Sequence, residues 1–127
     1  MKTIIKTEKA PPPIGPYNQA VAVQGQLLFT AGQIALDPTT GAVVGATAAE
    51  QTKQICENLN AILTASHSDF AHVVKTTVFL KSMNDFAAMN EVYGKYFSEA
   101  SPARSTIEVA RLPKDVLVEI EVVAVIY

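Results

Sequence analysis

Residues 116–127 have the sequence VLVEIEVVAVIY, and this stretch decides the fold class. Its dense β-branched residues are typical of a β-strand. Side chains of a strand alternate between two faces, and here both faces carry apolar residues. One face holds Val118, Ile120, Val122, Ala124 and Ile126, and the other holds Leu117, Glu119, Glu121, Val123 and Val125. The strand is therefore expected in a sheet that is covered on both sides.

Two amphipathic helices are predicted against one side of this sheet. Thr47 and Glu50 have capping-box spacing, and apolar residues then recur at helical intervals, which predicts a helix over residues 48–65. A second helix is predicted from Asn84 up to a boundary near Ser101 and Pro102. Because two helices cover one face only, we expect other copies of the chain to cover the second face.

The other elements follow from β-branched runs and turn residues. Strands are predicted at residues 2–6 and 73–81, a stiff proline-rich loop at 10–16 and a turn at 37–41, and Ser68 is expected to cap a helical turn. Two hairpins are expected, one joining residues 18–24 to 26–33 and one joining residues 103–110 to 116–127. The predicted fold is α+β, a sheet with two helices on one face, in a single domain over residues 1–127.

Composition and charge restrict the possible functions. The 127 residues are 49% hydrophobic and 17% charged with a net charge of −2, so we expect no basic surface and no nucleic-acid partner. No apolar run resembles a signal peptide or reaches the roughly 18 to 20 residues that span a bilayer. We therefore expect a cytoplasmic protein without a membrane partner. The single cysteine, Cys56, excludes an internal disulfide, and we expect no metal site.

Arg104 is a candidate binding residue because it lies just inside a predicted strand. The planar guanidinium suits bidentate binding of a carboxylate. A structural ion pair with an acidic residue is the alternative. The candidate acids are Glu119, Glu121 and Glu108, and the register of the closing hairpin would decide which of them faces Arg104. Such a pair could hold an anionic substrate and activate water, or it could be a charge pair on an edge strand.

The histidines and the cysteine are weaker candidates. His67 and His72 are five residues apart, which is not the spacing of one helical face, so we predict solvent-exposed loop histidines. Cys56 falls on the apolar face of the first helix, where a buried, inert thiol is expected. The sequence contains no nucleophile-elbow, P-loop, dinucleotide-binding or zincin motif.

Several short strings together resemble one known family. They are Ile14-Gly-Pro-Tyr17, Ala31-Gly-Gln-Ile34, Lys75-Thr-Thr-Val-Phe79, Asn84-Asp-Phe86, Pro102-Ala-Arg-Ser105, Val109-Ala-Arg-Leu-Pro-Lys-Asp-Val116 and Glu119-Ile-Glu121. The chain closely resembles the Rid family of reactive intermediate deaminases, also called YjgF, from about Thr7 to Val125. The block from residue 102 to residue 121 is its most specific part.

The resemblance implies a chorismate-mutase-like α+β subunit in a homotrimer, with three ligand clefts between neighbouring subunits. It also implies hydrolysis of enamine and imine intermediates released by pyridoxal-phosphate dehydratases. Examples are 2-aminoacrylate and 2-iminobutyrate, which give 2-oxo acids and ammonia. No cofactor is implied.

The resemblance also implies roles for individual residues. Arg104 matches the arginine that grips the substrate carboxylate, and Glu119 matches the acid that holds the attacking water. Tyr17 and Asn90 match cleft residues, and Gly32 matches the glycine whose backbone N–H contacts the ligand.

Two positions depart from the family pattern, and two further functions stay open. Ala31 stands where many members have serine, and Thr106 stands in the cleft where several have cysteine. A module that binds 2-oxo acids without turnover would use the same Arg104 cleft. RNA cleavage or inhibition of translation has been attached to relatives, but the charge of this chain argues against a nucleic-acid surface.

Overall fold

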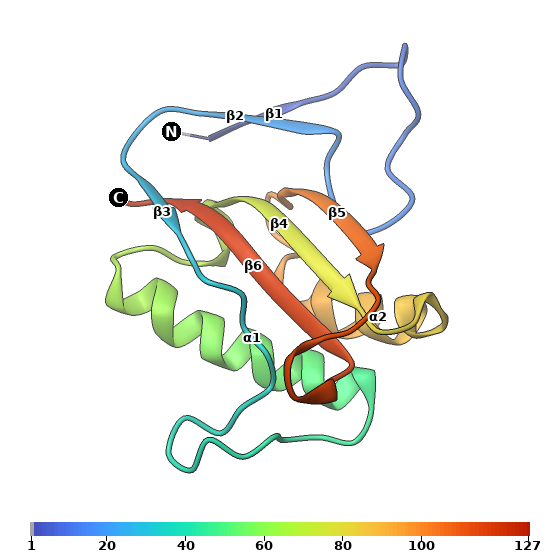
Figure 1. Ribbon diagram of the computed structural model, residues 1–127. Coiled ribbons are helices and arrows are strands. Elements are labelled where there is room, and N and C mark those ends of the chain that lie inside the picture. The colour runs from blue at the N-terminus through green and yellow to red at the C-terminus, as the bar shows by residue number, and fades with distance from the viewer. Residues whose placement is uncertain (1) are drawn as a thin grey trace.

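The computed structural model describes residues 2–127 and arranges them in layers (Figure 1). The larger sheet has the strand order β3-β6-β4-β5, and a smaller sheet pairs β1 with β2. The strands are β1 (Lys2–Ile5), β2 (Ala20–Val23), β3 (Leu27–Phe29), β4 (Val73–Leu80), β5 (Ala103–Glu108) and β6 (Val118–Val125). Helices α1 (Ala48–Ala65) and α2 (Phe86–Tyr96) lie on one side of the larger sheet, which confirms the predicted α+β arrangement.

Helix α1 has the predicted bounds because its first turn is capped as expected. The Thr47 hydroxyl accepts a hydrogen bond from the Glu50 backbone N–H at 3.2 Å, and the Glu50 carboxylate accepts one from the Thr47 N–H at 3.2 Å. Helix α2 is shorter than predicted. A short 3-10 helix, η2 (Met83–Asp85), precedes it, and the Ser82 hydroxyl caps this turn by accepting from the Asn84 N–H.

The core lies between the two helices and the larger sheet. Its largest fully buried side chains come from α1, α2, β4 and β6 and include Ile55, Leu59, Leu63, Met89, Tyr93, Val78, Leu80 and Ile120. Alternate residues of β6 point into this core, as the sequence predicted, since Val118, Ile120 and Val122 are buried.

Both predicted hairpins are wrong. β2 pairs with β1 and β3 pairs with β6, so Gly25, with a φ of 137°, links two different sheets. β4 lies between β5 and β6, parallel to β5 and antiparallel to β6. The physical reason is the α2 connection, since a helix between β4 and β5 allows the parallel pairing that a tight turn cannot make.

The segment between β5 and β6 passes the end of β4 through a short 3-10 helix, η3 (Pro113–Asp115). Lys114 and Asp115 both have positive φ values, 55° and 53°. The connection runs from Glu108, the last residue of β5, to Val118, the first of β6, so it is too long for a two-residue hairpin turn. Arg111 pairs with Asp115 at 2.8 Å on the exposed surface of the same segment.

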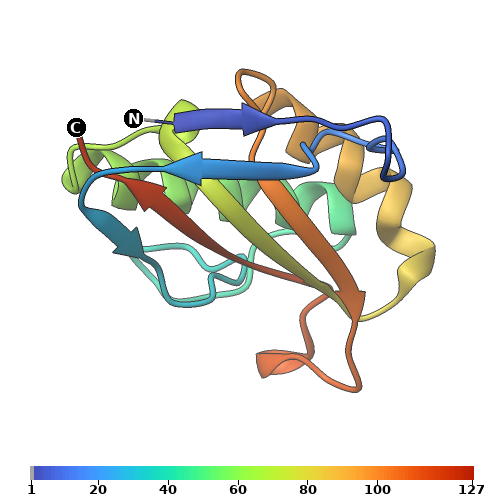
Figure 2. The ribbon, with the colours of Figure 1, turned by 90° about the horizontal axis from the view of Figure 1, so that it is seen from above.

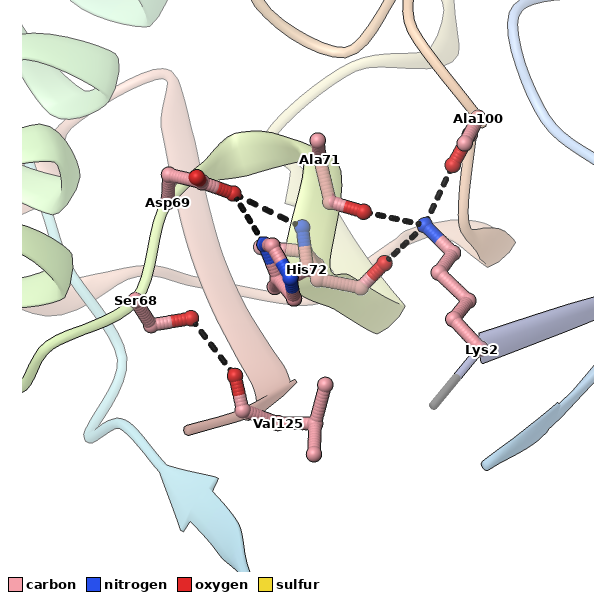
Figure 3. A network of polar contacts seen from close by, with 8 residues as sticks. Lys2, Ser68, Asp69, Ala71, His72, Ala100 and Val125 are labelled. Carbon is pink, nitrogen blue, oxygen red and sulfur yellow. Dashed lines mark hydrogen bonds and ion pairs between the residues drawn. The ribbon is translucent and has the colours of Figure 1, made fainter. Parts of the chain in front are cut away.

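The small sheet crosses one end of the larger sheet on the side away from the helices, as Figure 2 shows. Lys2 fixes its first strand, because its ammonium group donates to the backbone carbonyls of Ala71 at 3.0 Å, Val73 at 2.6 Å and Ala100 (Figure 3). Ala71 lies just before β4, Val73 is the first residue of β4, and Ala100 lies just before β5. One side chain therefore joins three segments that are distant in the sequence.

Two local predictions near this network need correction. Asp69, not Ser68, caps the short 3-10 helix η1 (Phe70–His72), and the Ser68 hydroxyl instead donates to the Val125 carbonyl at 2.8 Å (Figure 3). His72 is only partly exposed, because its Nδ1 lies 2.6 Å from Asp69 and its ring stacks on Tyr127 at 4.4 Å. His67 is exposed, as predicted.

Candidate active site

Arg104 points from β5 toward α2 and lies among aromatic rings. It is aligned with Thr76 of β4, which is buried and hydrogen-bonded to Tyr93 of α2 at 2.7 Å. The guanidinium carbon lies 4.7 Å from the ring centre of Tyr93, 5.2 Å from Tyr17 and 5.5 Å from Phe86. Cation–π attraction to these rings holds the charged group against α2.

Asn90 and Gly15 complete the surroundings of the guanidinium. Arg104 Nη1 donates to the Asn90 Oδ1 at 2.6 Å. A Cβ atom on Gly15 would lie 3.3 Å from Arg104 Nη2 and 3.4 Å from Asn90 Nδ2, so only glycine lets the backbone come this close without displacing them. Burial lowers the pKa of Arg104, but an arginine remains charged in proteins.

Arg104 has no ion-pair partner within residues 2–127, so the alternative of a structural ion pair is not observed there. A partly buried cation without a counter-ion is unfavourable unless an anion binds it. Thr106 adds a second unsatisfied group on the same side of β5, because its hydroxyl is buried and has no hydrogen-bond partner in the described chain. The arrangement can therefore accept a small anion that also receives a hydrogen bond.

The residues around Arg104 form one cluster, the Arg104 cluster. Glu119 of β6 and Gly32, which follows β3, form a second cluster. The Glu119 carboxylate lies directly over Gly32, where an added Cβ would come within 1.9 Å of Oε2. Glu119 is aligned with Phe79 of β4, and Phe79 is aligned with the exposed Ile107 of β5. These three side chains occupy the face of the sheet that the helices do not cover.

The two clusters therefore lie on opposite faces of one sheet. The register of a closing hairpin was expected to decide which glutamate faces Arg104, but β4 separates the two strands. Glu108 lies on the same face of β5 as Arg104, and its carboxylate accepts from the Met83 N–H at 2.8 Å, while Glu121 is exposed beside Glu119 on the uncovered face. Within residues 2–127 of one chain, no glutamate pairs with the Arg104 guanidinium.

Phe86 and Tyr93 were not predicted as site residues from the sequence. With Asn90 they stand at i, i+4 and i+7, the spacing of one helical face, and this spacing could have identified them. Each contacts Arg104.

Other chemistry-bearing groups do not join either cluster. Cys56 is buried, and burial raises the pKa of its thiol to about 12, which leaves it protonated. Across residues 2–127 no group of three or more histidine, cysteine or acidic side chains could hold a metal ion. In the same range no helix is long and apolar enough to cross a membrane.

Comparisons with known proteins identify the family. A family model described as Endoribonuclease L-PSP matches residues 7–126. A RutC family protein of Synechocystis is 62% identical over 125 residues, which cover 97% of this chain and 95% of that protein. The human 2-iminobutanoate/2-iminopropanoate deaminase is 46% identical over 125 residues, covering 98% of this chain and 90% of the enzyme.

A solved structure supports the same relationship. The structure of E. coli TdcF with bound serine has a TM-score of 0.76 to this chain at 43% identity and covers 98% of this chain and 99% of its own. Sequence and structural matches thus extend over almost the full length, and the chain belongs to the Rid (YjgF) family, whose model carries the description Endoribonuclease L-PSP.

Proposed function

We propose that this protein is a deaminase that hydrolyses 2-iminobutanoate, 2-aminoacrylate and similar compounds to 2-oxo acids and ammonia. The observation that carries the proposal is Arg104, a partly buried cation held by aromatic rings with no acidic partner in the described chain. Relatives of this chain in the same family include the human and mouse 2-iminobutanoate/2-iminopropanoate deaminases. A substrate carboxylate would supply the missing counter-charge.

The proposed complete site lies between two copies of the chain in a homotrimer. One copy would supply Arg104, Tyr17, Asn90 and Thr106, and the other would supply Glu119 with the backbone of Gly32. This division is supported by the positions of the two clusters on opposite faces of the sheet. The uncovered face also bears exposed apolar side chains that a second copy would bury.

The chemistry needs few groups because an imine already reacts with water. In the proposed mechanism Arg104 binds the substrate carboxylate and draws electron density from the adjacent C=N carbon. Glu119 removes a proton from water while the water oxygen bonds to that carbon, and the C=N electron pair moves to nitrogen. Glu119 then passes this proton to the nitrogen, which gives a carbinolamine and restores the carboxylate. Cleavage of the C–N bond then releases ammonia as the hydroxyl proton moves to nitrogen and the C=O bond forms. Orientation and one base account for the acceleration.

Binding without turnover is the second candidate, and a specific observation favours it. The Arg104 cluster is assembled within a single chain, whereas Glu119 is not part of it. Ala31 beside Gly32 also offers no hydroxyl group to a ligand. Such a protein would bind 2-oxo acids at Arg104 and leave imines unchanged.

A coupled assay distinguishes these functions. Threonine dehydratase generates 2-iminobutanoate, and semicarbazide traps the imine that remains, so a deaminase lowers the amount of semicarbazone formed. We expect lower trapping with the parent protein, together with 2-oxobutanoate binding. Binding with unchanged trapping would favour the binding module and contradict the deaminase. Cleavage of RNA with neither effect would assign an endoribonuclease activity instead.

A further inference from the structure

Gln19 lies at the base of the proline-rich loop and makes an unusual number of backbone hydrogen bonds. Its Oε1 accepts from the Thr7 N–H at 2.8 Å. Its Nε2 lies within hydrogen-bond distance of three carbonyls, those of Thr7 at 3.1 Å, Ala10 at 3.3 Å and Pro11 at 2.7 Å. One half-buried carboxamide thus fixes both ends of a turn in the chain.

The loop depends on this side chain because its prolines lack backbone N–H groups. Residues 11–13 are three consecutive prolines, which accept hydrogen bonds but cannot donate them. All three are exposed, so side-chain packing does little to hold them. A hollow of about 570 Å³ lies beside Lys6, Pro12 and Gln19, and it leaves the loop space into which it could move.

The far end of the same loop forms part of the Arg104 cluster. Gly15 lies against the guanidinium, the Tyr17 ring lies under it, and the Tyr17 hydroxyl accepts from the Ile14 N–H at 3.2 Å. Pro16 packs near Gly94 of α2. A movement of the loop would therefore change the surface that meets the substrate carboxylate.

Asn18 fixes the position of the loop relative to β5. Its backbone N–H donates to the Pro102 carbonyl at 3.0 Å, and its side-chain Nδ2 donates to the Ser101 carbonyl at 2.7 Å. Arg104 lies two residues after Pro102. Asn18 and Gln19 thus bond to different segments, Asn18 to the start of β5 and Gln19 to the loop.

We propose that Gln19 is a positioning residue of the deaminase, which acts through the proline-rich loop to hold Gly15 and Tyr17 against Arg104. The inference rests on the proposed function and deepens it. Gln19 does not touch the guanidinium in this structure, and its effect is transmitted by the backbone of residues 10–17. Since Glu119 lies on the other face of the sheet, the loop controls substrate binding more than the attack of water.

Gln51 provides a matched control. It is a buried glutamine whose amide also joins two distant backbone groups, donating to the Gly45 carbonyl at 3.1 Å and accepting from the Leu117 N–H at 2.9 Å. It contacts neither cluster. Gln19→Met and Gln51→Met remove the same chemical group with similar side-chain size, so only the position differs.

The test compares steady-state kinetics, 2-oxobutanoate binding and the melting temperature of the two variants. For Gln19→Met we expect KM for 2-iminobutanoate and Kd for 2-oxobutanoate to rise roughly tenfold or more, with kcat within about threefold of the parent. For Gln51→Met we expect a lower melting temperature with parental KM. Equal effects of the two variants on KM, or a parental KM and Kd in Gln19→Met, would overturn the proposal.

A second readout does not depend on turnover. The Nε–Hε NMR signal of Arg104 reports ring currents from Tyr17, and we expect it to shift in Gln19→Met but not in Gln51→Met. If the parent protein shows no deaminase activity, the proposed function fails, and this signal still decides whether Gln19 positions the loop. An unshifted signal contradicts the inference. Gln19→Glu, which keeps the size but loses both amide donors, replaces Gln19→Met if that variant does not fold.

Discussion

Arg104 donates a hydrogen bond to one neutral amide within residues 2–127, that of Asn90, although a guanidinium has five N–H donors. The rings of Tyr17 and Tyr93 stabilise its charge without using those donors. The remaining donors are therefore available for both oxygens of a carboxylate.

Arg104→Lys is expected to remove most activity and leave the fold intact. A lysine keeps the positive charge but cannot bind a carboxylate through a planar pair of N–H groups. Losing that interaction in a partly desolvated site should cost roughly 2 to 5 kcal/mol, or about thirtyfold to several thousandfold in kcat/KM. The measurement is kcat/KM for 2-iminobutanoate, with thermal melts alongside.

Arg111→Lys is the matched control for this change, because Arg111 is exposed and paired with Asp115 away from both clusters. We expect parental kinetics from it. If Arg104→Lys also melts normally and works within about threefold of the parent, Arg104 does not bind the substrate carboxylate.

Glu119→Gln is expected to slow hydrolysis while leaving 2-oxobutanoate binding nearly unchanged. The amide keeps the size of the side chain over Gly32 but cannot take a proton from water. The loss should be partial, since the imine also hydrolyses without the protein. Rates are compared from about pH 6 to 9. Rates equal to those of the parent over this range would direct attention to Glu121, which is exposed on the same face.

At the scale of an element, α1 presents Cys56 to the core and not to either cluster. Cys56→Ala should therefore keep full activity and lower the free energy of unfolding by up to about 1 kcal/mol, as expected when a small buried group is removed. Turnover and urea unfolding measure the two effects. Loss of turnover in a variant that remains folded would reveal a role for the thiol.

The stability difference between parent and Cys56→Ala should also depend on pH. Burial, assisted by the charge of Glu57, raises the pKa of the thiol to about 12 in the folded protein. An unfolded thiol titrates near 8.5, so the folded state holds the proton more tightly. This contribution is fully present below the unfolded pKa and is lost as the pH rises toward the folded one. Urea midpoints should therefore fall more steeply above about pH 8.5 in the parent than in the variant.

At the scale of the whole molecule, the face of the larger sheet that the helices do not cover carries exposed apolar side chains. Phe29 is 69% exposed and is aligned with Val123 of β6, and Ile107 is 44% exposed on the same face. Exposed apolar groups that gather on one face are typical of a surface that meets another subunit. This observation and the separated clusters both support the proposed homotrimer.

Light scattering tests the assembly. We expect the parent to be a trimer at micromolar concentration and Phe29→Asp to dissociate it, because a charge would have to be buried at the interface. Met83→Asp, at a 40% exposed apolar residue beside α2, serves as the control and should remain trimeric. A parent protein that is a stable monomer would contradict both the trimer and the cleft between subunits. An unaffected trimer in Phe29→Asp would move the interface to another surface.

Much of the fold could be predicted from the sequence because the relevant interactions are local. The capping box of Thr47 and Glu50, the helical spacing of α1 and the alternation along β6 involve residues only a few positions apart. The turn at residues 37–41 also depends on a local interaction, because the Gly41 N–H donates to the Asp37 carbonyl at 2.8 Å. Arg104 was identified by its residue type and by the family strings around it.

Strand partners and the two-sided site were decided only by the tertiary structure. β5 and β6 are close in sequence, but β4 lies between them because a helical connection and a long β5–β6 segment allow a non-consecutive order. The position of β4 places Arg104 against α2 and leaves Glu119 on the far face. The sequence determined which residues alternate along each strand, whereas long-range pairing determined which strands are neighbours and which cluster each side chain joins.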